Sequence, residues 1–485
     1  MKKFLFIITG SIVIFSSCKR QLDINRDPSK PDASQGSPSL VFPAAVMSTA
    51  GRIGGDLTIL GGIWSEYYTQ ANSSNQYKTI DAYNLQNTDY NGAYTELYSG
   101  AISDYQFVLD KSEASGDWKY FLMATVMKAY TMQVLADLYD QVPYSQASLG
   151  TKNLNPAFDD GYTIYTDLLK KIDTALAKDF SANTNSDPST NDLLFSGDMS
   201  KWKKFANTLK LKMYLRMVNA KSAEAEAGIK KLYSDGAEFL TFDAAVTGFT
   251  ATPDKQNPFY AYNIQRLNVG TNLRASKTFT TWLTANGDPR NVAYFGSASP
   301  VAMHQGDYTS TDASYGTSAV FVQAPTDPVE FISLAESNFM QAEARERYYA
   351  GDKAQDLYNQ GVLAAFAEVG ETGTTFIAPG GKYEYPAGGS LDQKIEAIIV
   401  QKWASLAYGS HSLEAFFERN RTGYPRSSAV YSTDLNYIPG QLVYSKNGVT
   451  SGKFPKRLLF PDVERSRNTS TPAVVPLTTP VWWAK

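Results

Sequence analysis

One thiol in a defined position is the clearest chemical signal in this sequence, because Cys18 is the only cysteine among 485 residues. It follows Lys2, Lys3, an apolar run over residues 4–15 and two small serines. This order is typical of a secretory signal peptide, and the apolar run is shorter than the roughly twenty residues that span a bilayer. A lone cysteine cannot form an internal disulfide, but its thiol can accept lipid. We therefore predict a signal peptide over residues 1–17 and acylation of Cys18.

The same leader resembles that of bacterial lipoproteins, in which the acylated cysteine becomes the mature N-terminus. Several acyl chains would anchor the protein stably, since a single chain binds only marginally. The alternative is an ordinary secreted protein whose cysteine lies near the cleavage site by chance. Residues 18–43 contain four prolines among serines, so we predict a lipidated cysteine followed by a flexible tether. The chain is expected to work outside the cytoplasm, held at a membrane.

Histidine chemistry is limited to two residues, His304 and His411. A zinc site rich in histidine is therefore excluded, and a Ser-His-Asp triad would have to use one of these two. Neither histidine lies in a recognisable motif. We interpret both as structural or incidental.

Glu336 and Glu343 could be read as a pair of catalytic carboxylates, because a spacing of seven places both on one helix face. Glycoside hydrolysis needs two carboxyl groups roughly 5–10 Å apart across one bond. Seven residues along a helix separate them by about 10.5 Å, and both lie in an expected scaffold helix. The sequence predicts no catalytic residue, no metal site and no cofactor.

Aromatic side chains lie beside amide, hydroxyl and arginine groups in two stretches, residues 64–83 and 257–315. This mixture suits a ligand with apolar faces and many hydroxyls, as sugars have. No short motif marks a site in either stretch, and core packing is an equal alternative for every residue. The candidate ligand contacts that we select are Trp64, Asn75, Tyr77, Trp282 and Tyr308.

The charge balance argues against nucleic acid as a partner. The 45 basic and 48 acidic residues are well mixed and leave a net charge of −3. Tyrosine is abundant, with 31 residues alongside 7 tryptophans. We expect most of these rings to pack helices and some to form a binding surface.

Apolar residues at helical spacing recur in pairs of segments. Residues 118–139 are apolar nearly all round, which predicts a helix buried between others. Helical pairs are predicted at about 90–140, 161–221, 330–370 and 390–420. Stacked pairs are typical of a tetratricopeptide-like solenoid, although the strict repeat of roughly 34 residues is missing.

Between these pairs the sequence changes character. Residues 236–329 hold Gly, Pro, Asn, Thr and aromatics with almost no helical period, and residues 371–389 and 421–485 are also expected to form loops. Loops of this length are usually functional. The predicted fold is mainly α, with a tetratricopeptide-like scaffold of helical pairs and long irregular loop insertions that form a binding face. We expect residues 44–485 to be a single domain.

Short motifs are spread in a fixed order over nearly the whole mature chain. Together, and behind a lipoprotein leader, they resemble the SusD/RagB family of outer-membrane nutrient-binding lipoproteins, most closely its SusD-like branch of starch-binding proteins associating with the outer membrane. Two positions depart from the family pattern, Asp140 in place of glycine and Asn420 in place of arginine. The matching segments are 22–28 (LDINRDP), 137–145 (DLYDQVPYS), 197–210 (GDMSKWKKFANTLK), 288–290 (DPR), 335–344 (AESNFMQAEA), 401–403 (QKW) and 419–425 (RNRTGYP).

The resemblance implies a tetratricopeptide-type scaffold, a ligand-binding face built from loops, and a SusC-like TonB-dependent transporter that the protein covers as a hinged lid. Family ligands are most often oligosaccharides, with peptides as a variation. A lipid-anchored position at the cell surface of the outer membrane is also implied. Residues 19–23 contain no clear run of acidic residues that would signal export to the surface. The prediction that the anchor lies in the outer leaflet therefore depends on the resemblance alone.

Two of the motifs are expected to pin loops onto helices. The arginines of 288–290 and 419–425 suit this role because a guanidinium pairs with a carboxylate through two parallel hydrogen bonds. Two other functions remain open from the sequence. They are a surface glycoside hydrolase and a solenoid module that binds a protein partner without nutrient.

Overall fold

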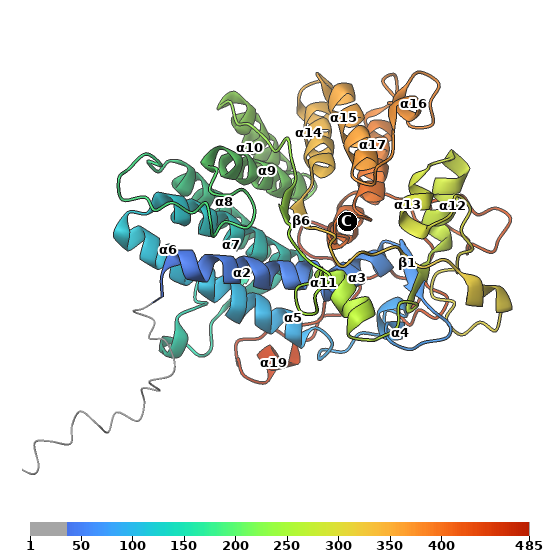
Figure 1. Ribbon diagram of the computed structural model, residues 1–485, viewed down its shortest axis with the longest axis horizontal. Coiled ribbons are helices and arrows are strands. Elements are labelled where there is room, and N and C mark those ends of the chain that lie inside the picture. The colour runs from blue at the N-terminus through green and yellow to red at the C-terminus, as the bar shows by residue number, and fades with distance from the viewer. Residues whose placement is uncertain (1–35, 485) are drawn as a thin grey trace, which may run out of the picture.

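The computed structural model describes residues 36–484, and most of the regular structure in this range is helical. Helices α6 to α10 form one end of the molecule, and short helices and strands gather at the other end (Figure 1). The predicted signal peptide, Cys18 and the first part of the tether lie outside the described residues. None of the helices between residues 36 and 484 combines the length and hydropathy needed to cross a bilayer.

A long central helix organises the scaffold. α7 (Trp118–Tyr139) has the same bounds as the predicted buried helix. Asp117 caps its N-terminus by accepting a hydrogen bond from the Tyr120 N–H, which satisfies one of the free donors there. Most of its side chains are buried because α6 (Ser103–Ser115), α8 (Gly161–Leu176) and α9 (Met199–Met217) pack around it.

The predicted scaffold of helical pairs is confirmed. The further scaffold helices are α5 (Asn91–Glu96), the π-helix η2 (Leu97–Ile102), α10 (Ser222–Ser234), α14 (Leu334–Tyr348), α15 (Ala354–Ala367), α17 (Leu391–Ser405) and α18 (Leu413–Thr422). α10 packs on α9, and α14, α15 and α17 contact one another and stand side by side (Figure 1). Short helices lie in the connections, namely α3 (Asp56–Trp64), α4 (Lys78–Asp81), η3 (Gly150–Lys152), η5 (Ala313–Thr317), α16 (Thr374–Ile377) and α19 (Asp462–Arg465).

The end of the predicted tether is wrong, because α2 (Pro38–Ile53) already includes its last six residues. Proline is compatible with the first helical turn, where its missing N–H has no partner to lose. The side chain of Phe42 is fully buried and packs against the rings of Tyr105, Tyr120 and Trp202 at about 6 Å. This burial anchors the start of α2 in the core, so an extended tether can reach residue 37 at most.

The loop-rich region at 236–329 holds more regular structure than predicted. It contains α11 (Pro258–Tyr260), the π-helix η4 (Ala261–Gln265), α12 (Lys277–Asn286) and α13 (Arg290–Phe295). α12 is rich in threonine and weak in helix propensity, but Ser276 caps its start and Gly287 ends it in the left-handed region. The ring of Phe279 in α12 packs edge-on against Trp403 of α17, so tertiary contacts stabilise α12.

Small antiparallel strand pairs connect segments far apart in the sequence. They are β1 (Tyr68–Gln70) with β5 (Leu273–Ala275), β2 (Gln141–Pro143) with β3 (Phe158–Asp160), and β4 (Ala244–Val246) with β6 (Val329–Ile332). The first pair fixes the loops that follow α3 against the region before α12.

Buried charges join the helices of the scaffold. Lys212 of α9 and Lys402 of α17 both contact the Glu336 carboxylate of α14, at 3.0 and 3.3 Å. Arg216 of α9 pairs with Glu414 of α18 at 2.7 Å. All of these side chains are almost completely buried. We call this set the buried ion network, with Asp137, Lys212, Arg216, Glu336, Glu343, Lys402, Glu414, Glu418 and Arg421 as its members.

The arginines of both motifs form buried ion pairs with carboxylates, but Arg421 joins helix α18 to helix α14 and Arg290 pairs within its own turn, so neither pair ties a loop to a helix as predicted. The Arg421 guanidinium donates two parallel hydrogen bonds to Glu343, at 2.7 and 2.6 Å, and two more to Glu418. Arg290 pairs in the same way with Asp288, at 3.0 and 2.6 Å. Glu336 and Glu343 are therefore held in structural ion pairs in the scaffold, which agrees with the interpretation that they are not a catalytic pair.

Candidate functional site

Three loops meet on one side of the molecule and form what we call the loop face, residues 71–79, 304–317 and 431–449. Asn72 donates a side-chain hydrogen bond to the Ser310 carbonyl at 3.1 Å, which joins the first loop to the second. The Tyr431 hydroxyl donates to the Gln305 carbonyl at 2.7 Å, which joins the third. These contacts hold the loops in fixed relative positions.

Rings and polar groups are mixed on the loop face. Tyr308 is half-buried, and the Lys78 ammonium lies 5.2 Å from the centre of its ring. His304 and Tyr431 pack ring against ring at 5.8 Å, and His304 Nδ1 lies 2.7 Å from the Ser432 hydroxyl. Exposed amides and hydroxyls surround these rings, from Ser73, Asn75, Gln76, Thr79, Thr309 and Ser314.

A buried carboxylate supports the loop face from beneath. Asp81 accepts hydrogen bonds from the Thr69 hydroxyl at 2.6 Å, the Gln70 N–H at 2.9 Å and the Gln305 side chain at 2.8 Å. Burial raises the pKa of Asp81 to about 6 despite these donors. The Thr69 hydroxyl also accepts from the Gly306 N–H, so one carboxylate fixes the bases of two loops.

Of the five selected residues, Asn75, Tyr77 and Tyr308 come together in or directly beneath the loop face. Asn75 is exposed and Tyr308 is half-buried, so both are accessible. Tyr77 is only 6% exposed, and its hydroxyl donates to Asn263 at 3.2 Å. Tyr77 therefore supports the loop face from below.

The two selected tryptophans lie elsewhere. Trp64 is 2% exposed and its indole N–H donates to the Ile80 carbonyl, so its ring packs in the core. Trp282 is half-buried on α12, stacks on Tyr383 at 5.4 Å and lines a separate cavity of about 270 Å³. The selection of Trp64 as an accessible ligand contact is therefore wrong, because composition cannot tell which direction a ring faces, and Trp282 stays a prediction that lies away from the loop face.

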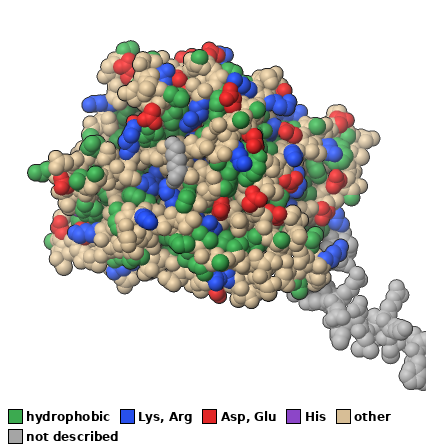
Figure 2. Space-filling model, turned by 180° about the vertical axis from the view of Figure 1, so that it is seen from behind, with side chains coloured by type: hydrophobic (Ala, Val, Ile, Leu, Met, Phe, Trp, Pro, Cys, Tyr) green, Lys and Arg blue, Asp and Glu red, His purple; other side chains and the backbone are tan. Residues whose placement is uncertain are grey.

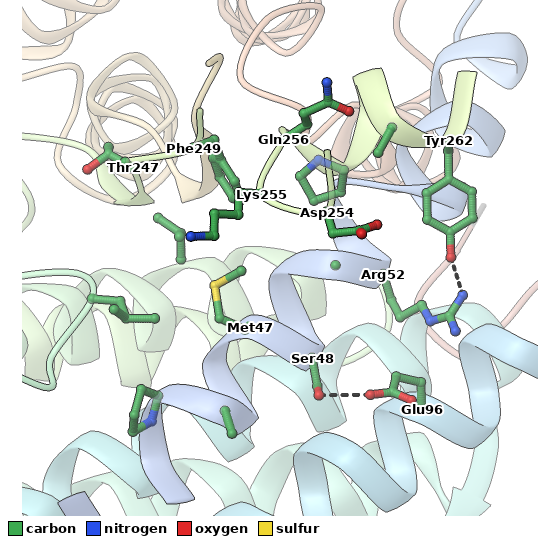
Figure 3. A pocket seen from close by; sticks show the side chains of 18 of the residues that line it. Met47, Ser48, Arg52, Glu96, Thr247, Phe249, Asp254, Lys255, Gln256 and Tyr262 are labelled. Carbon is green, nitrogen blue, oxygen red and sulfur yellow. Dashed lines mark hydrogen bonds between the residues drawn. The ribbon is translucent and has the colours of Figure 1, made fainter. Parts of the chain in front are cut away.

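A second hollow was missed by the sequence analysis. A cavity of about 930 Å³ opens between α2 and the loop that precedes α11 (Figure 3). Met47, Ser48 and Arg52 of α2 line one side, and Figure 3 shows the Ser48 hydroxyl directed at Glu96, to which it donates at 2.8 Å. The lining residues come from four distant segments, near 40–52, 96, 193 and 246–266, and no motif marks any of them.

One wall of this cavity is a tyrosine between two arginines. The Arg52 guanidinium donates to the Tyr262 hydroxyl, and the Arg266 guanidinium lies 4.1 Å from the centre of the same ring. Asp56 pairs with Arg52 at 3.3 Å, and burial still raises the pKa of Asp56 to about 6. Tyr262 and Asn263 are neighbours in the π-helix η4. Tyr262 lines this cavity, whereas Asn263 accepts the hydrogen bond from Tyr77 beneath the loop face, so η4 lies between the two sites.

The second histidine has a structural position. His411 is 2% exposed, and burial lowers its pKa to about 3, so its ring is neutral at ordinary pH. On the face shown in Figure 2, basic and acidic side chains are interspersed.

A family model described as starch-binding proteins associating with the outer membrane, SusD-like, matches residues 57–444. The chain belongs to this family. The SusD-like assignment agrees with the resemblance carried by the sequence motifs, and the family's association with the outer membrane agrees with the predicted location. A comparison with curated proteins gives no match.

Solved structures show the same fold. A SusD homologue from Bacteroides uniformis aligns with a TM-score of 0.74 at 22% identity, over 92% of this chain and 99% of the other. A chitin-binding SusD homologue from Flavobacterium johnsoniae aligns with a TM-score of 0.73 at 21% identity, over 91% and 98%. A SusD/RagB family protein from Bacteroides thetaiotaomicron gives 0.73 at 22%, over 92% and 99%. At this identity the likeness establishes the fold alone.

Proposed function

We propose that this protein is a lipid-anchored nutrient-binding subunit at the cell surface, and that its loop face captures an oligosaccharide for a SusC-like TonB-dependent transporter. In this proposal the protein covers the transporter barrel as a hinged lid, and Cys18 carries the anchor. Membership of the SusD-like family supports the proposal. The observation that carries it is the accessible Tyr308 ring, set among exposed amides and hydroxyls on three loops held together by hydrogen bonds.

A sugar ring has an apolar C–H face and a rim of hydroxyls. The Tyr308 ring offers a flat platform for the first, and Asn75 and Gln76 offer exposed amide groups for the second. Lys78 over Tyr308 can donate to hydroxyl or carbonyl oxygens. Peptide is the second ligand class, because the same amides can pair with a peptide backbone.

The binding test uses the mature chain with Cys18→Ser, which removes the predicted acylation site. A panel of oligosaccharides that includes chitin oligomers, chosen because one similar structure is named chitin-binding, and a peptide library are titrated by calorimetry. We expect one class to bind, and Tyr308→Ala to weaken it about tenfold, the upper range for one aromatic contact. Tyr214→Ala is the matched control, a half-buried tyrosine on α9 away from the loop face. Equal affinity of the wild type and Tyr308→Ala would move the ligand off this face.

The transporter test uses the native lipoprotein in outer-membrane extracts. Affinity capture should recover a large TonB-dependent barrel protein, and Cys18→Ser should release the protein from the membrane fraction. Recovery of a different partner, with no barrel protein, would favour the solenoid interaction module.

Catalysis is not part of the proposed function. The two carboxylates that share one helix face, Glu336 and Glu343, are held in the buried ion network. Incubation of the bound oligosaccharide with the purified protein should leave its length unchanged. Release of shorter sugars would favour the surface glycoside hydrolase.

A further inference from the structure

Three carboxylates from separate segments converge away from the loop face. Asp243 precedes β4, Glu330 lies in β6, and Glu368 ends α15. One oxygen from each lies within 4.8 Å of the other two. Figure 1 places β6 at the lower end of α14, where the helical pair α14–α15 joins the rest of the molecule.

The carboxylates lack sufficient partners from the protein. In the described part of the chain, no donor reaches Glu330 Oε2 or either oxygen of Glu368, and all three atoms are buried. Asp243 accepts one hydrogen bond, from the Leu334 N–H at 2.7 Å. Glu368 also lies at the C-terminal end of a helix, where the helix dipole disfavours negative charge. Buried acceptors without donors are costly, so such a cluster requires an explanation.

A second, independent group is directed at the cluster. The His411 side chain is 3% exposed, and its Nε2 lies 3.5 Å from Glu330 Oε2, too far for a good hydrogen bond. Within residues 36–484, neither ring nitrogen of His411 has a hydrogen-bond partner. The ring therefore lies beside the cluster as a buried polar side chain with an unused nitrogen.

The backbone is shaped to admit the Glu330 carboxylate. Gly409 has a φ of +73°, and its carbonyl accepts the Glu330 N–H at 2.9 Å. A Cβ at Gly409 would lie 2.2 Å from Glu330 Oε2. Only glycine fits at this position, so the turn between α17 and α18 closes over the carboxylate.

We propose that Asp243, Glu330 and Glu368 bind a hard divalent cation, with Ca²⁺ the best match. Ca²⁺ binds oxygen ligands at about 2.3–2.6 Å, so two of its ligands lie at most about 5 Å apart, which the cluster satisfies. A cation would supply the missing partners of the buried oxygens and offset three like charges. Asp243 is exposed, which gives the ion a path from solvent. His411, whose Nε2 lies 3.5 Å from Glu330 Oε2, would complete a hydrogen bond to this carboxylate in the metal-bound form, since metal-bound carboxylates are themselves hydrogen-bonded.

The cation would act as a structural clamp. It would join the loop before β4, strand β6 and the end of α15, which are separated by more than one hundred residues of chain between Asp243 and Glu368. This role is independent of which ligand the loop face binds.

The test uses the mature chain with Cys18→Ser, dialysed against chelator. Calorimetric titration with Ca²⁺, Mg²⁺ and Mn²⁺ should show one site that prefers Ca²⁺, and thermal unfolding should shift upward by several degrees with Ca²⁺. Tb³⁺, a Ca²⁺ substitute, should give sensitised emission because Tyr408 adjoins Gly409. Glu368→Gln and Asp243→Asn should each weaken Ca²⁺ at least tenfold and remove the Tb³⁺ signal. The surface control Asp235→Asn, from an exposed pair with Lys231, should change neither.

The unfolding temperatures of Glu368→Gln and the wild type should also change their order when Ca²⁺ is added. Without metal the variant should unfold at a temperature no lower than that of the wild type, because a neutral amide at this buried position carries no charge that needs a partner. With Ca²⁺ the wild type should unfold at the higher temperature. The absence of binding by all three cations, or binding that Glu368→Gln and Asp243→Asn leave unchanged, would overturn the proposal in favour of carboxyl groups that are simply protonated.

Discussion

Glu66 carries the most informative prediction about stability, because it lies fully buried just after α3 at the point where three segments meet. Its Oε2 accepts hydrogen bonds from the Thr278 hydroxyl of α12 and from the Val443 N–H of the third loop, the latter at 3.2 Å. Among the described residues no donor reaches Oε1. Burial therefore dominates over these partners and over the nearby Arg419, and it raises the pKa of Glu66 from 4.5 to about 8.

A raised carboxyl pKa makes stability fall as pH rises. In the unfolded chain Glu66 ionises near pH 4.5, whereas in the folded protein it stays protonated until about pH 8. Between these values the folded state binds more protons than the unfolded state, so the free energy of unfolding decreases with pH and levels off above about 8. Each pKa unit corresponds to about 1.4 kcal/mol, and the loss therefore reaches about 2–5 kcal/mol once local relaxation is included.

The substitution Glu66→Gln keeps the side-chain shape and an oxygen for both donors but cannot ionise. Its guanidinium unfolding midpoint should nearly equal that of the wild type at pH 5 and exceed it by a margin that grows up to pH 9. The difference in unfolding midpoint between the wild type and Glu66→Gln reports on Glu66 alone, because Asp56 and Asp81 titrate in both proteins. Glu113→Gln, at an exposed position of α6, is the control and should follow the wild-type curve. Parallel curves for the wild type and Glu66→Gln would refute the reasoning.

Further predictions concern the packing of the scaffold, each measured by denaturant unfolding. Gly61→Ala should destabilise by at least about 1–3 kcal/mol, because a Cβ there would lie 2.3 Å from the Leu413 Cα; an unchanged midpoint would contradict the α3–α18 contact. Arg421→Met should cost about 3–5 kcal/mol, since Glu343 and Glu418 each lose one buried cation partner, and a neutral result would mean that these carboxylates protonate freely. Trp483→Ala should cost about 3–5 kcal/mol, whereas Trp483→Phe, which keeps an aromatic ring but loses the 2.7 Å hydrogen bond to Asp137, should cost about 1–3 kcal/mol; a Trp483→Phe variant as stable as the wild type would exclude a role for the bond.

Helices with a strong apolar pattern could be predicted from the sequence. Residues 118–139 are apolar on every side, and only a helix surrounded by other helices buries such a surface, so α7 was predicted at its observed bounds. α12 was missed because its threonines disfavour a helix locally. Its stability comes from Trp403, more than one hundred residues away, and a contact of that range leaves no periodic signal.

The candidate site could be predicted only in part for a related reason. Composition identified the stretch that contains Asn75 and the stretch that contains Tyr308, and the fold brings the two together. Composition could not tell that Tyr308 is accessible and Trp64 is buried. Both are aromatic residues among polar ones, and only the folded backbone decides which side chain points to solvent. The cavity beside α2 was invisible, since its lining comes from segments that share no pattern.

The buried ion network also constrains how this protein can vary over evolution. Loss of one cation, such as Lys402, leaves the carboxylates around it buried without enough positive charge. Loss of one carboxylate leaves buried cations without enough negative charge. Acceptable changes must therefore be coordinated, as swaps of opposite charges or as joint replacement by apolar side chains of similar volume. The network evolves as one unit, while the exposed loops around Asn75 and Tyr308 are free to change one residue at a time. This division lets single positions of the loops change while the rigid framework keeps its fold.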